Sequence, residues 1–182
     1  MLTVRCDEQL PVGAARLGEP AAWDALFKRY QAPLYVYVFE LVRDQQESLD
    51  IVQETFVNAV RHIANLRVDA RFGSWLFGIA HQKCIQRWRR QDRDERLLEL
   101  QAGLPIEPVS DPGELLIRKE REEQVLRLVD QLSAPQRAVV LLHFIEEFSL
   151  EEIAEITHAE LGTVKSRLHY AKRTLRKLLE GI

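Results

Sequence analysis

A cluster of cationic side chains near the end of the chain has the residue types and spacing that contact nucleic acid. An apolar residue recurs at helical spacing from Val164 to Leu179, which predicts a helix with one buried side. The other sides carry Lys165, Arg167, His169, Lys172, Arg173, Arg176 and Lys177. Lys and Arg bind phosphates and the edges of bases, so DNA is the favoured ligand. A solvated amphipathic helix, or one that binds an acidic protein, stays open as an alternative.

A second, shorter helix is predicted directly before the basic one. Ser149 and Glu152 form a capping-box pattern, and Phe148 with Ile153 fits a hydrophobic staple at the same end. A tight turn around His158 separates the two helices. A short capped helix, a turn and a basic helix together predict a helix-turn-helix that docks in a DNA major groove.

Charge is distributed unevenly along the chain. The 182 residues carry a formal net charge of −3 and have a pI near 6.0, values that do not by themselves indicate a nucleic-acid binder. Basic residues gather in Lys83–Arg90 and Lys165–Lys177, whereas acidic residues dominate Asp44–Glu54 and Asp92–Glu123. The segment Gln91–Glu123 holds ten acidic and five basic side chains, a composition that an ordinary solvated linker explains.

Several functional classes find no support in the sequence. Two cysteines, Cys6 and Cys84, are too few for a disulfide framework, and reduced thiols favour the cytoplasm. No signal peptide or membrane-length apolar run is present, so no membrane insertion is expected. No catalytic constellation or glycine-rich phosphate loop occurs, and His81 with Cys84 supplies only two metal ligands. We expect no enzyme activity, metal, cofactor or small-molecule substrate.

Hydrophobic periodicity predicts an all-α protein with two blocks. The first block runs from about residue 21 to 90, and its apolar stripes fall in four groups: Trp23, Leu26, Phe27 and Tyr30; then Leu34 to Val42; then Val52, Phe56, Ala59, Val60 and Ile63; then Trp75 to Trp88. Asp44 and Glu47 cap the third group. Prolines and glycines in 101–113 break the helical pattern, and a second block begins near Glu114. In this second block Ser133 and Gln136 offer a further helix cap.

Five segments carry a resemblance to a known family. DIVQETF at Asp50–Phe56 resembles the DLVQETF segment of the extracytoplasmic-function sigma factors, a branch of the sigma-70 superfamily. SWLFGIA at Ser74–Ala80 is similar to their TWLYRIA, and Leu132–Arg137 is similar to their LPPRQR. Glu151–Glu155 and Gly162–Leu168 resemble their EEIAE and GTVKSRL. The segments occur in the family's order and at compatible spacing.

The resemblance implies two small helical domains joined by a flexible linker. Its divisions are an N-terminal extension at 1–20, sigma region 2 at 21–91, an acidic linker at 92–113 and sigma region 4 at 114–182. In the family, region 2 binds core RNA polymerase and opens the minus-ten promoter element, and region 4 reads the minus-thirty-five element. Such a chain selects promoters for core polymerase and is controlled by an anti-sigma factor.

At the positions that match the family's motifs, the resemblance implies the following roles for residues of this chain. Asp50, Gln53 and Glu54 share one face of a helix and would bind the polymerase clamp. The residues expected at the minus-ten element are Leu66, Arg67, Asp69, Arg71, Phe72, Gln82, Lys83 and Arg87. Those expected at the minus-thirty-five element are Thr163, Lys165, Ser166, Arg167, His169, Tyr170 and Arg173.

The chain departs from the family pattern at four of these positions or their neighbours. Gly78 and Tyr170 stand where the family commonly has Arg, and Gln82 stands where it has Asn. His158 occupies a turn position where Gly is usual and a left-handed backbone is expected, which histidine tolerates less well than Gly. Gly78 within a helix points to close packing or close approach of DNA.

Two other functions stay open on the sequence alone. The chain could be a helix-turn-helix regulator that binds duplex DNA without serving as a polymerase subunit, or an interaction protein that titrates a partner. Dependence of DNA binding and transcription on core polymerase separates a sigma factor from both.

Replacing Arg167 tests the predicted recognition helix. Arg167→Ala should lose promoter discrimination while core binding persists, because one base-edge donor is removed from a helix that does not contact the clamp. Competition between promoter variants in run-off transcription measures discrimination. Lys177→Ala, at a position we expect to contact phosphate or solvent, is the matched control. Unchanged selectivity in Arg167→Ala would remove Arg167 from the set of base-reading residues.

Overall fold

The computed structural model describes residues 10–102 and 129–180, with side chains described for 10–90 and 129–179. The first block contains α1 (Val12–Arg16), α2 (Pro20–Val42), α3 (Gln45–His62), the 3-10 turns η1 (Ile63–Asn65) and η2 (Asp69–Arg71), and α4 (Phe72–Ala102). The second block contains α6 (Ala134–Phe144), α7 (Leu150–Thr157) and α8 (Leu161–Glu180). No strand occurs within these described ranges.

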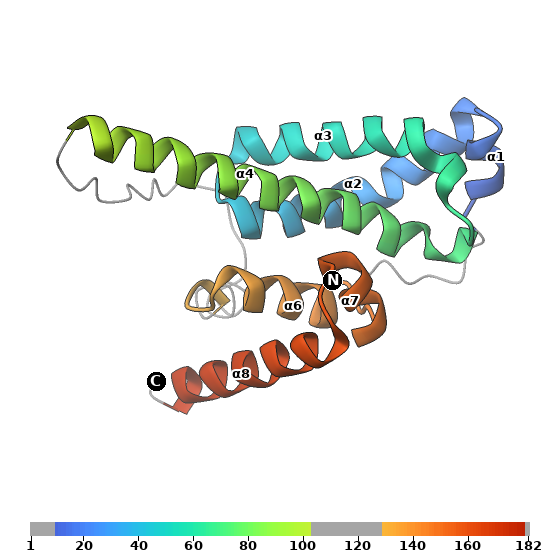
Figure 1. Cartoon of the computed structure of the whole chain (residues 1–182). Coiled ribbons are helices and arrows are strands. Elements are labelled where there is room, and N and C mark those ends of the chain that lie inside the picture. The colour runs from blue at the N-terminus through green and yellow to red at the C-terminus, as the bar shows by residue number, and fades with distance from the viewer. Residues whose placement is uncertain (1–9, 103–128, 181–182) are drawn as a thin grey trace, which may run out of the picture.

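The first block is a bundle in which α2, α3 and α4 pack against one another, with α1 at one end (Figure 1). Its core is rich in aromatic rings. Phe72 lies 5.4 Å from Tyr30 and 5.9 Å from Trp75, measured between ring centroids. Tyr37 and Phe77 pack at 5.4 Å, and both are almost fully buried. Burial of these rings, together with that of aliphatic neighbours such as Leu26, Leu34 and Leu76, holds the three helices together.

The predicted helix caps form. Asp44 accepts a hydrogen bond from the Glu47 N–H at 2.7 Å, so α3 begins where the charged turn was expected. Arg43 ends α2 in the left-handed conformation, with a φ of 61°. In the second block Ser133 and Ser149 begin α6 and α7, and Glu152 accepts from the Ser149 N–H at 2.8 Å.

Three details of the first block differ from the sequence-based expectation. The first two apolar groups belong to one helix, α2, which continues through Pro33. Proline removes one backbone hydrogen bond there, but Tyr30 and Leu34 on either side are buried, and this packing outweighs the loss. Val60 is 52% exposed and not buried, because α2 and α4 cover only one side of α3. Helix α4 continues to Ala102, so residues 92–102 of the expected linker are helical, and 103–113 lie outside the described residues.

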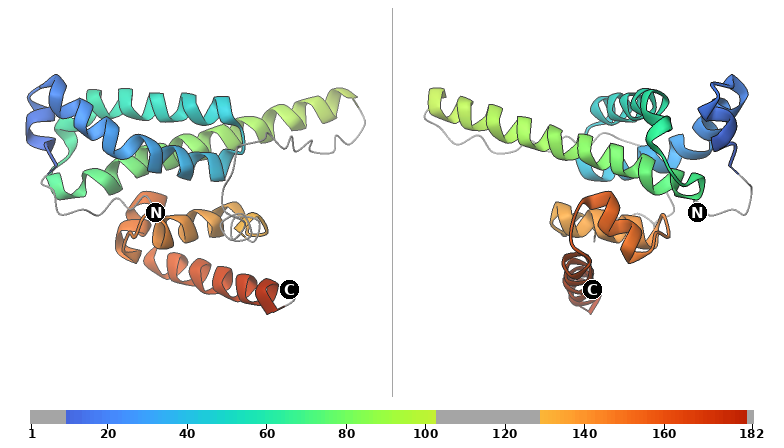
Figure 2. Two further views of the ribbon diagram at one scale, coloured as in Figure 1. Left: turned by 180° about the vertical axis from the view of Figure 1, so that it is seen from behind. Right: turned by 45° about the vertical axis from the view of Figure 1, so that its right-hand side comes forward.

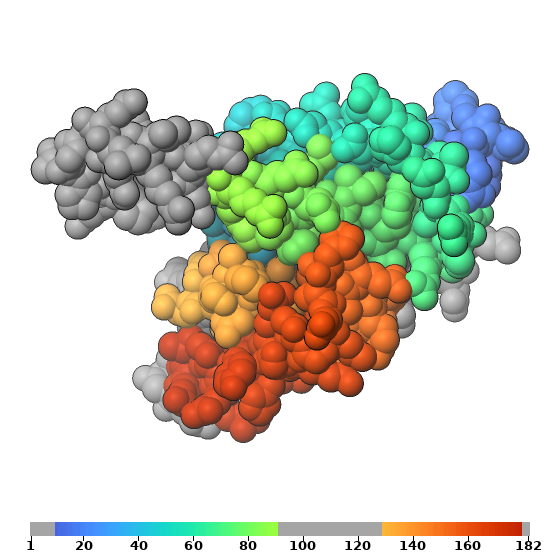
Figure 3. All heavy atoms as spheres, viewed as in Figure 1, coloured from blue at the N-terminus to red at the C-terminus, as the bar shows by residue number. Residues whose placement is uncertain are grey.

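The second block packs beneath the first. Helix α6 contacts α2, and α7 contacts α4, while α8 runs along the far side of α6 and α7 (Figures 1 and 2). The space-filling view shows α7 directly against α4 (Figure 3). The predicted helix that leads into Leu132 lies outside the described residues except for its last few positions. Helices α2 and α4 therefore both contact the second block.

Substitution of Phe72 tests whether its ring stabilises the core of the first block or is free to contact DNA. It is fully buried, so Phe72→Ala should lower the free energy of unfolding by about 3–5 kcal/mol through lost burial and a residual cavity. Val60→Ala, at a half-exposed position, should cost less than about 1 kcal/mol. Urea denaturation followed by circular dichroism measures both. Equal losses in the two variants would contradict the described core.

Candidate nucleic-acid interface

Helix α8 presents the predicted recognition surface. Val164, Leu168 and Ala171 are buried against the rest of the second block. Most of the expected base-reading side chains are exposed: Lys165, Ser166, His169, Tyr170 and Arg173. Thr163 and Arg167 are half-buried. The structure thus brings the whole predicted set onto one helix and leaves most of it accessible.

The turn between α7 and α8 adopts the conformation expected from its position. His158 has a φ of 49° and a ψ of 42°, the left-handed region in which Gly is favoured. The N–H groups of His158 and Ala159 donate to the carbonyls of Glu155 and Ala154 at 3.3 and 3.1 Å. These bonds satisfy the end of α7, so the histidine keeps the sharp turn of a helix-turn-helix.

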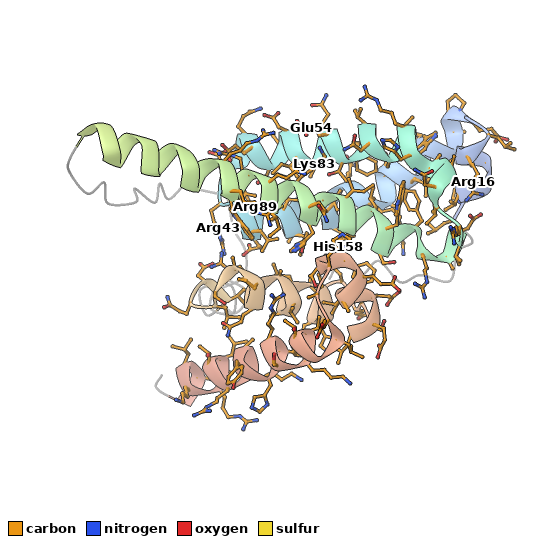
Figure 4. All side chains as sticks on the ribbon, viewed as in Figure 1. Arg16, Arg43, Glu54, Lys83, Arg89 and His158 are labelled. Atoms are coloured by element: carbon orange, nitrogen blue, oxygen red, sulfur yellow. The ribbon has the colours of Figure 1, made fainter. Side chains whose placement is uncertain are left out.

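The predicted polymerase-binding acids lie along α3 next to basic residues of α4. Lys83 donates to Glu54 at 2.6 Å, and both point into the space between the two helices (Figure 4). Arg87 donates to Glu47 through Nε at 2.6 Å and also through Nη2. Lys83 and Arg87 were expected at the minus-ten element. In this structure both are paired with acidic side chains of α3. The Glu54 side chain is 66% exposed and the Lys83 side chain is 15% exposed, so water reaches this ion pair from the carboxylate side.

The other two residues of the expected clamp surface, Asp50 and Gln53, line one surface hollow together with Glu54 and Lys83. Asp50 accepts a hydrogen bond from Gln46 on the same helix at 3.3 Å. Gln53 borders an apolar groove of about 720 Å³ between α2 and α3, which is lined mainly by Trp23, Phe27, Tyr35, Leu49, Phe56, Val57 and Val60. Our sequence reasoning missed this groove. The available signal was Val57, an apolar residue that falls outside the predicted buried stripe of α3.

Part of the predicted minus-ten set lines one cavity. A cavity of about 350 Å³ is bordered on the first block by Leu66, Arg71, Ser74, Trp75, Gly78, Ile79 and Gln82, and on the second by Glu155 and His158. Its lining combines apolar side chains, such as Trp75 and Ile79, with the guanidinium group of Arg71 and the amide group of Gln82. An extruded base needs such an environment, because stacking surface and hydrogen-bonding groups replace what it loses in the duplex.

The remaining predicted minus-ten residues lie elsewhere. Arg67 is exposed, and Asp69 accepts an ion-paired hydrogen bond from Arg16 of α1 at 2.5 Å. Phe72 is buried in the core among Tyr30, Trp23 and Trp75, so its ring is not available to a base in this structure. The aromatic type of Phe72 indicated stacking, but its place at the first turn of α4 directs the ring inward.

A buried polar cluster lies where the two blocks meet. Tyr37 and the Nδ1 atom of His81 are 2.8 Å apart, and both side chains are buried. Burial, together with the positive charges of His158 and Arg167, lowers the pKa of His81 to about 4. Glu146, which follows α6, is 2% exposed, and its Oε2 atom has no hydrogen-bond partner. Burial raises the pKa of the Glu146 carboxyl to about 8.

Two further findings concern the described residues as a group. Within 10–102 and 129–180, no three His, Cys, Asp or Glu side chains are placed so that they could hold a metal ion. None of the helices described there is both long enough and apolar enough to cross a membrane.

Comparison with known proteins agrees with this arrangement. Residues 26–94 match the family described as Sigma-70 region 2, and residues 122–175 match Sigma-70, region 4. The RNA polymerase sigma-H factor of Pseudomonas aeruginosa is 30% identical over 100% of this chain and 98% of its own. The ECF RNA polymerase sigma factor SigW of Bacillus subtilis is 29% identical over 91% of this chain and 92% of its own.

A solved structure shows the same fold. The sigma factor RpoE from Bartonella quintana, crystallised with the anti-sigma factor NepR, has a TM-score of 0.71 and 23% identity, covering 87% of this chain and 96% of that one. Two helical domains of sigma-70 type are therefore present, which confirms the predicted all-α fold class. The chain belongs to the sigma-70 family of RNA polymerase sigma factors, in its extracytoplasmic-function branch.

The pKa of Glu146 predicts how stability depends on pH. The carboxyl binds its proton more tightly in the folded chain, so its contribution to stability is lost as the pH rises from about 4.5 to about 8. His81 has the opposite sign, and its contribution is lost as the pH falls from about 6.5 to about 4. Of these two groups, only Glu146 changes charge between pH 6.5 and 8.

Glu146→Gln should therefore flatten the fall in the free energy of unfolding between pH 6.5 and 8. Chemical denaturation at several pH values across this range measures the slope. Glu147→Gln, which changes the exposed neighbour, should leave the slope as in the unsubstituted chain. A slope that persists in Glu146→Gln would show that Glu146 is not the titrating group.

Proposed function

We propose that this chain directs core RNA polymerase to a dedicated set of promoters, using three surfaces in a fixed order along the chain. The observation that carries the proposal is their coexistence: an acidic face on α3, a base-sized cavity beside α4, and a cationic recognition helix α8. A regulator that acts without polymerase needs only the third surface. The α3 and α4 residues of the first two surfaces fall within residues 26–94, which match region 2, and the cationic residues 165–173 of α8 fall within residues 122–175, which match region 4.

Recruitment of polymerase would rest on α3. Asp50, Gln53 and Glu54 form a polar surface, and the apolar groove between α2 and α3 lies directly beside Gln53. An interface with an apolar centre and a charged rim is typical of specific protein–protein contact. We assign both parts of this surface to the clamp of core polymerase, with basic groups of the clamp replacing Lys83 as partners of Glu54.

Promoter reading would use both blocks. Helix α8 would enter the major groove of the minus-thirty-five element, with Lys165, Arg167 and Arg173 as donors to base edges or phosphates. At the minus-ten element, the cavity beside α4 would accept an unstacked base, with Gln82 bonding the base edge and Arg71 a neighbouring phosphate. Trp75 is half-buried and lines this cavity, so it serves as a wall of the pocket and not as a free stacking platform.

The remaining parts of the proposal follow from the same surfaces. The chain supplies no reacting group, because nucleotide addition belongs to the polymerase. Its partners are core RNA polymerase, promoter DNA and an anti-sigma factor that masks these surfaces, which places it in the cytoplasm. The proposed function requires no cofactor.

Run-off transcription with purified core polymerase on a library of promoter fragments tests this function. Specific transcripts should appear only with the added protein, and should vanish for the double variant Asp50→Arg/Glu54→Arg, because two charge reversals repel a basic clamp surface. The loss should exceed about tenfold at equal protein concentration.

The matched control reverses two exposed acids of the second block. Glu147→Arg/Glu151→Arg changes net charge by the same amount but leaves the clamp surface of the first block intact, so its transcripts should persist. Retention of duplex DNA by the protein alone, with no transcript that depends on core polymerase, would favour the independent regulator and reject the proposal.

A further inference from the structure

Arg16, the last residue of α1, contacts the loop 66–71, which leads into α4. Its Nη2 atom donates to the backbone carbonyl of Leu66 at 3.0 Å and to the Oδ1 atom of Asp69 at 2.5 Å. Figure 4 shows Arg16 at the end of the first block, where α1 lies beside η1, the turn that precedes this loop. One guanidinium nitrogen therefore bonds to the loop on both sides of Arg67 and Val68.

Two residues of this loop, Arg67 and Val68, lie at its outer surface. The Leu66 side chain is buried, and the Leu66 N–H donates to the Ile63 carbonyl at 3.1 Å. Further along, the Arg71 N–H donates to the Val68 carbonyl at 2.9 Å. Between these bonded points, Arg67 is exposed and Val68 is 51% exposed. An exposed cation next to an exposed apolar side chain can contact both a phosphate and an unstacked base.

Burial anchors α1 to the rest of the first block. Val12 is fully buried, and Ala15 is 2% exposed. The Nε1 atom of Trp23 donates to the Ala15 carbonyl at 2.9 Å, which joins α1 to α2. On the loop side, a Cβ atom added at Gly13 would lie 3.8 Å from the Oδ2 atom of Asp69, so this carboxylate also approaches the backbone of α1. The loop is therefore bonded to a packed helix.

The same loop borders the predicted minus-ten cavity. Leu66 and Arg71, at its two ends, both line the cavity beside α4. A shift of the Leu66 backbone would therefore change the shape of the cavity wall. Arg16 also pairs with the carboxylate of Asp69, which would otherwise repel the phosphates of a bound promoter. Both effects favour binding at the minus-ten element, and neither requires Arg16 itself to touch DNA.

We propose that Arg16 is a positioning residue for minus-ten recognition: it holds the loop 66–71 in the shape that presents Arg67 and Val68 to the promoter. The inference rests on the proposed function of the cavity beside α4. Arg16 precedes residues 26–94, the part of the chain that matches region 2, so its role follows from its contacts alone. Removal of its side chain should alter selectivity at the minus-ten element and leave core recruitment and minus-thirty-five reading intact.

Run-off transcription from two promoter pairs, taken from the library described above, tests the selectivity. One pair differs by a base in the minus-ten element, and the other differs by a base in the minus-thirty-five element. Arg16→Ala should reduce the preference within the first pair by about two- to tenfold, the effect of one lost hydrogen bond, and leave the second pair unchanged. A transcript ratio does not depend on how much of the chain is folded, so a merely structural role would move neither pair.

Lys28→Ala is the matched control. It removes one exposed cation and breaks an ion pair, but the partner, Asp24, lies on the same helix and not in the loop. Both of its transcript ratios should equal those of the unsubstituted chain. An unchanged minus-ten preference in Arg16→Ala, or an equal loss in Lys28→Ala, would overturn the proposal. If Arg16 instead bound a phosphate directly, transcription from every promoter would fall by one factor and depend less on salt, which would also overturn it.

Amide hydrogen exchange of the full chain measures the loop without DNA. In Arg16→Ala, peptides that cover residues 63–71 should exchange about two- to tenfold faster, because a contact that closes the loop is lost, whereas peptides of α8 should be unchanged. Unchanged exchange in the loop, or an equal increase in α8, would reject the positioning role. If no promoter yields a transcript, the proposed function fails, while hydrogen exchange still decides whether Arg16 holds the loop.

Discussion

Burial of helix α4 on two sides is the constraint on which the rest of the structure depends. One side, through Phe72 and Phe77, completes the aromatic core of the first block with Tyr30 and Tyr37. Another side receives α7 and Phe148 from the second block. Since one helix serves as core, as wall of a cavity and as docking face, any change in its packing reaches both DNA-reading regions.

Several charged side chains of the candidate interface are paired with side chains of opposite charge in this structure. Glu54 and Glu47 of α3 hold Lys83 and Arg87, and Glu155 of α7 holds Arg71. Arg71 and Glu155 are each 54% exposed, so their pair contributes little to stability, and under the proposed function a phosphate would replace the carboxylate at small cost. The net charge of −3 conceals this arrangement, because cations and anions cancel in the sum wherever they lie. Function here depends on where the charges lie.

The interface between the blocks also explains two residues that local rules disfavour. Gly78 weakens a helix interior, and His158 holds a left-handed backbone that Gly adopts more easily. Both costs are local, and both residues line the same contact. Close approach of two helices compensates for the first, and completed hydrogen bonds at the end of α7 compensate for the second.

Much of this protein was determined by sequence alone. The caps at Asp44, Ser133 and Ser149 follow from side chains that bond their own backbone neighbours, and the face of α8 follows from helical periodicity. The tertiary structure decided what depends on distant contacts. The two predicted apolar stripes lie on one helix that continues through Pro33, and Val60 is exposed whereas Phe72 is buried. Glu155 accepts an ion-paired hydrogen bond from Arg71. A periodic pattern shows that a side is apolar, but whether another element covers that side is a property of packing, which joins residues far apart in the chain.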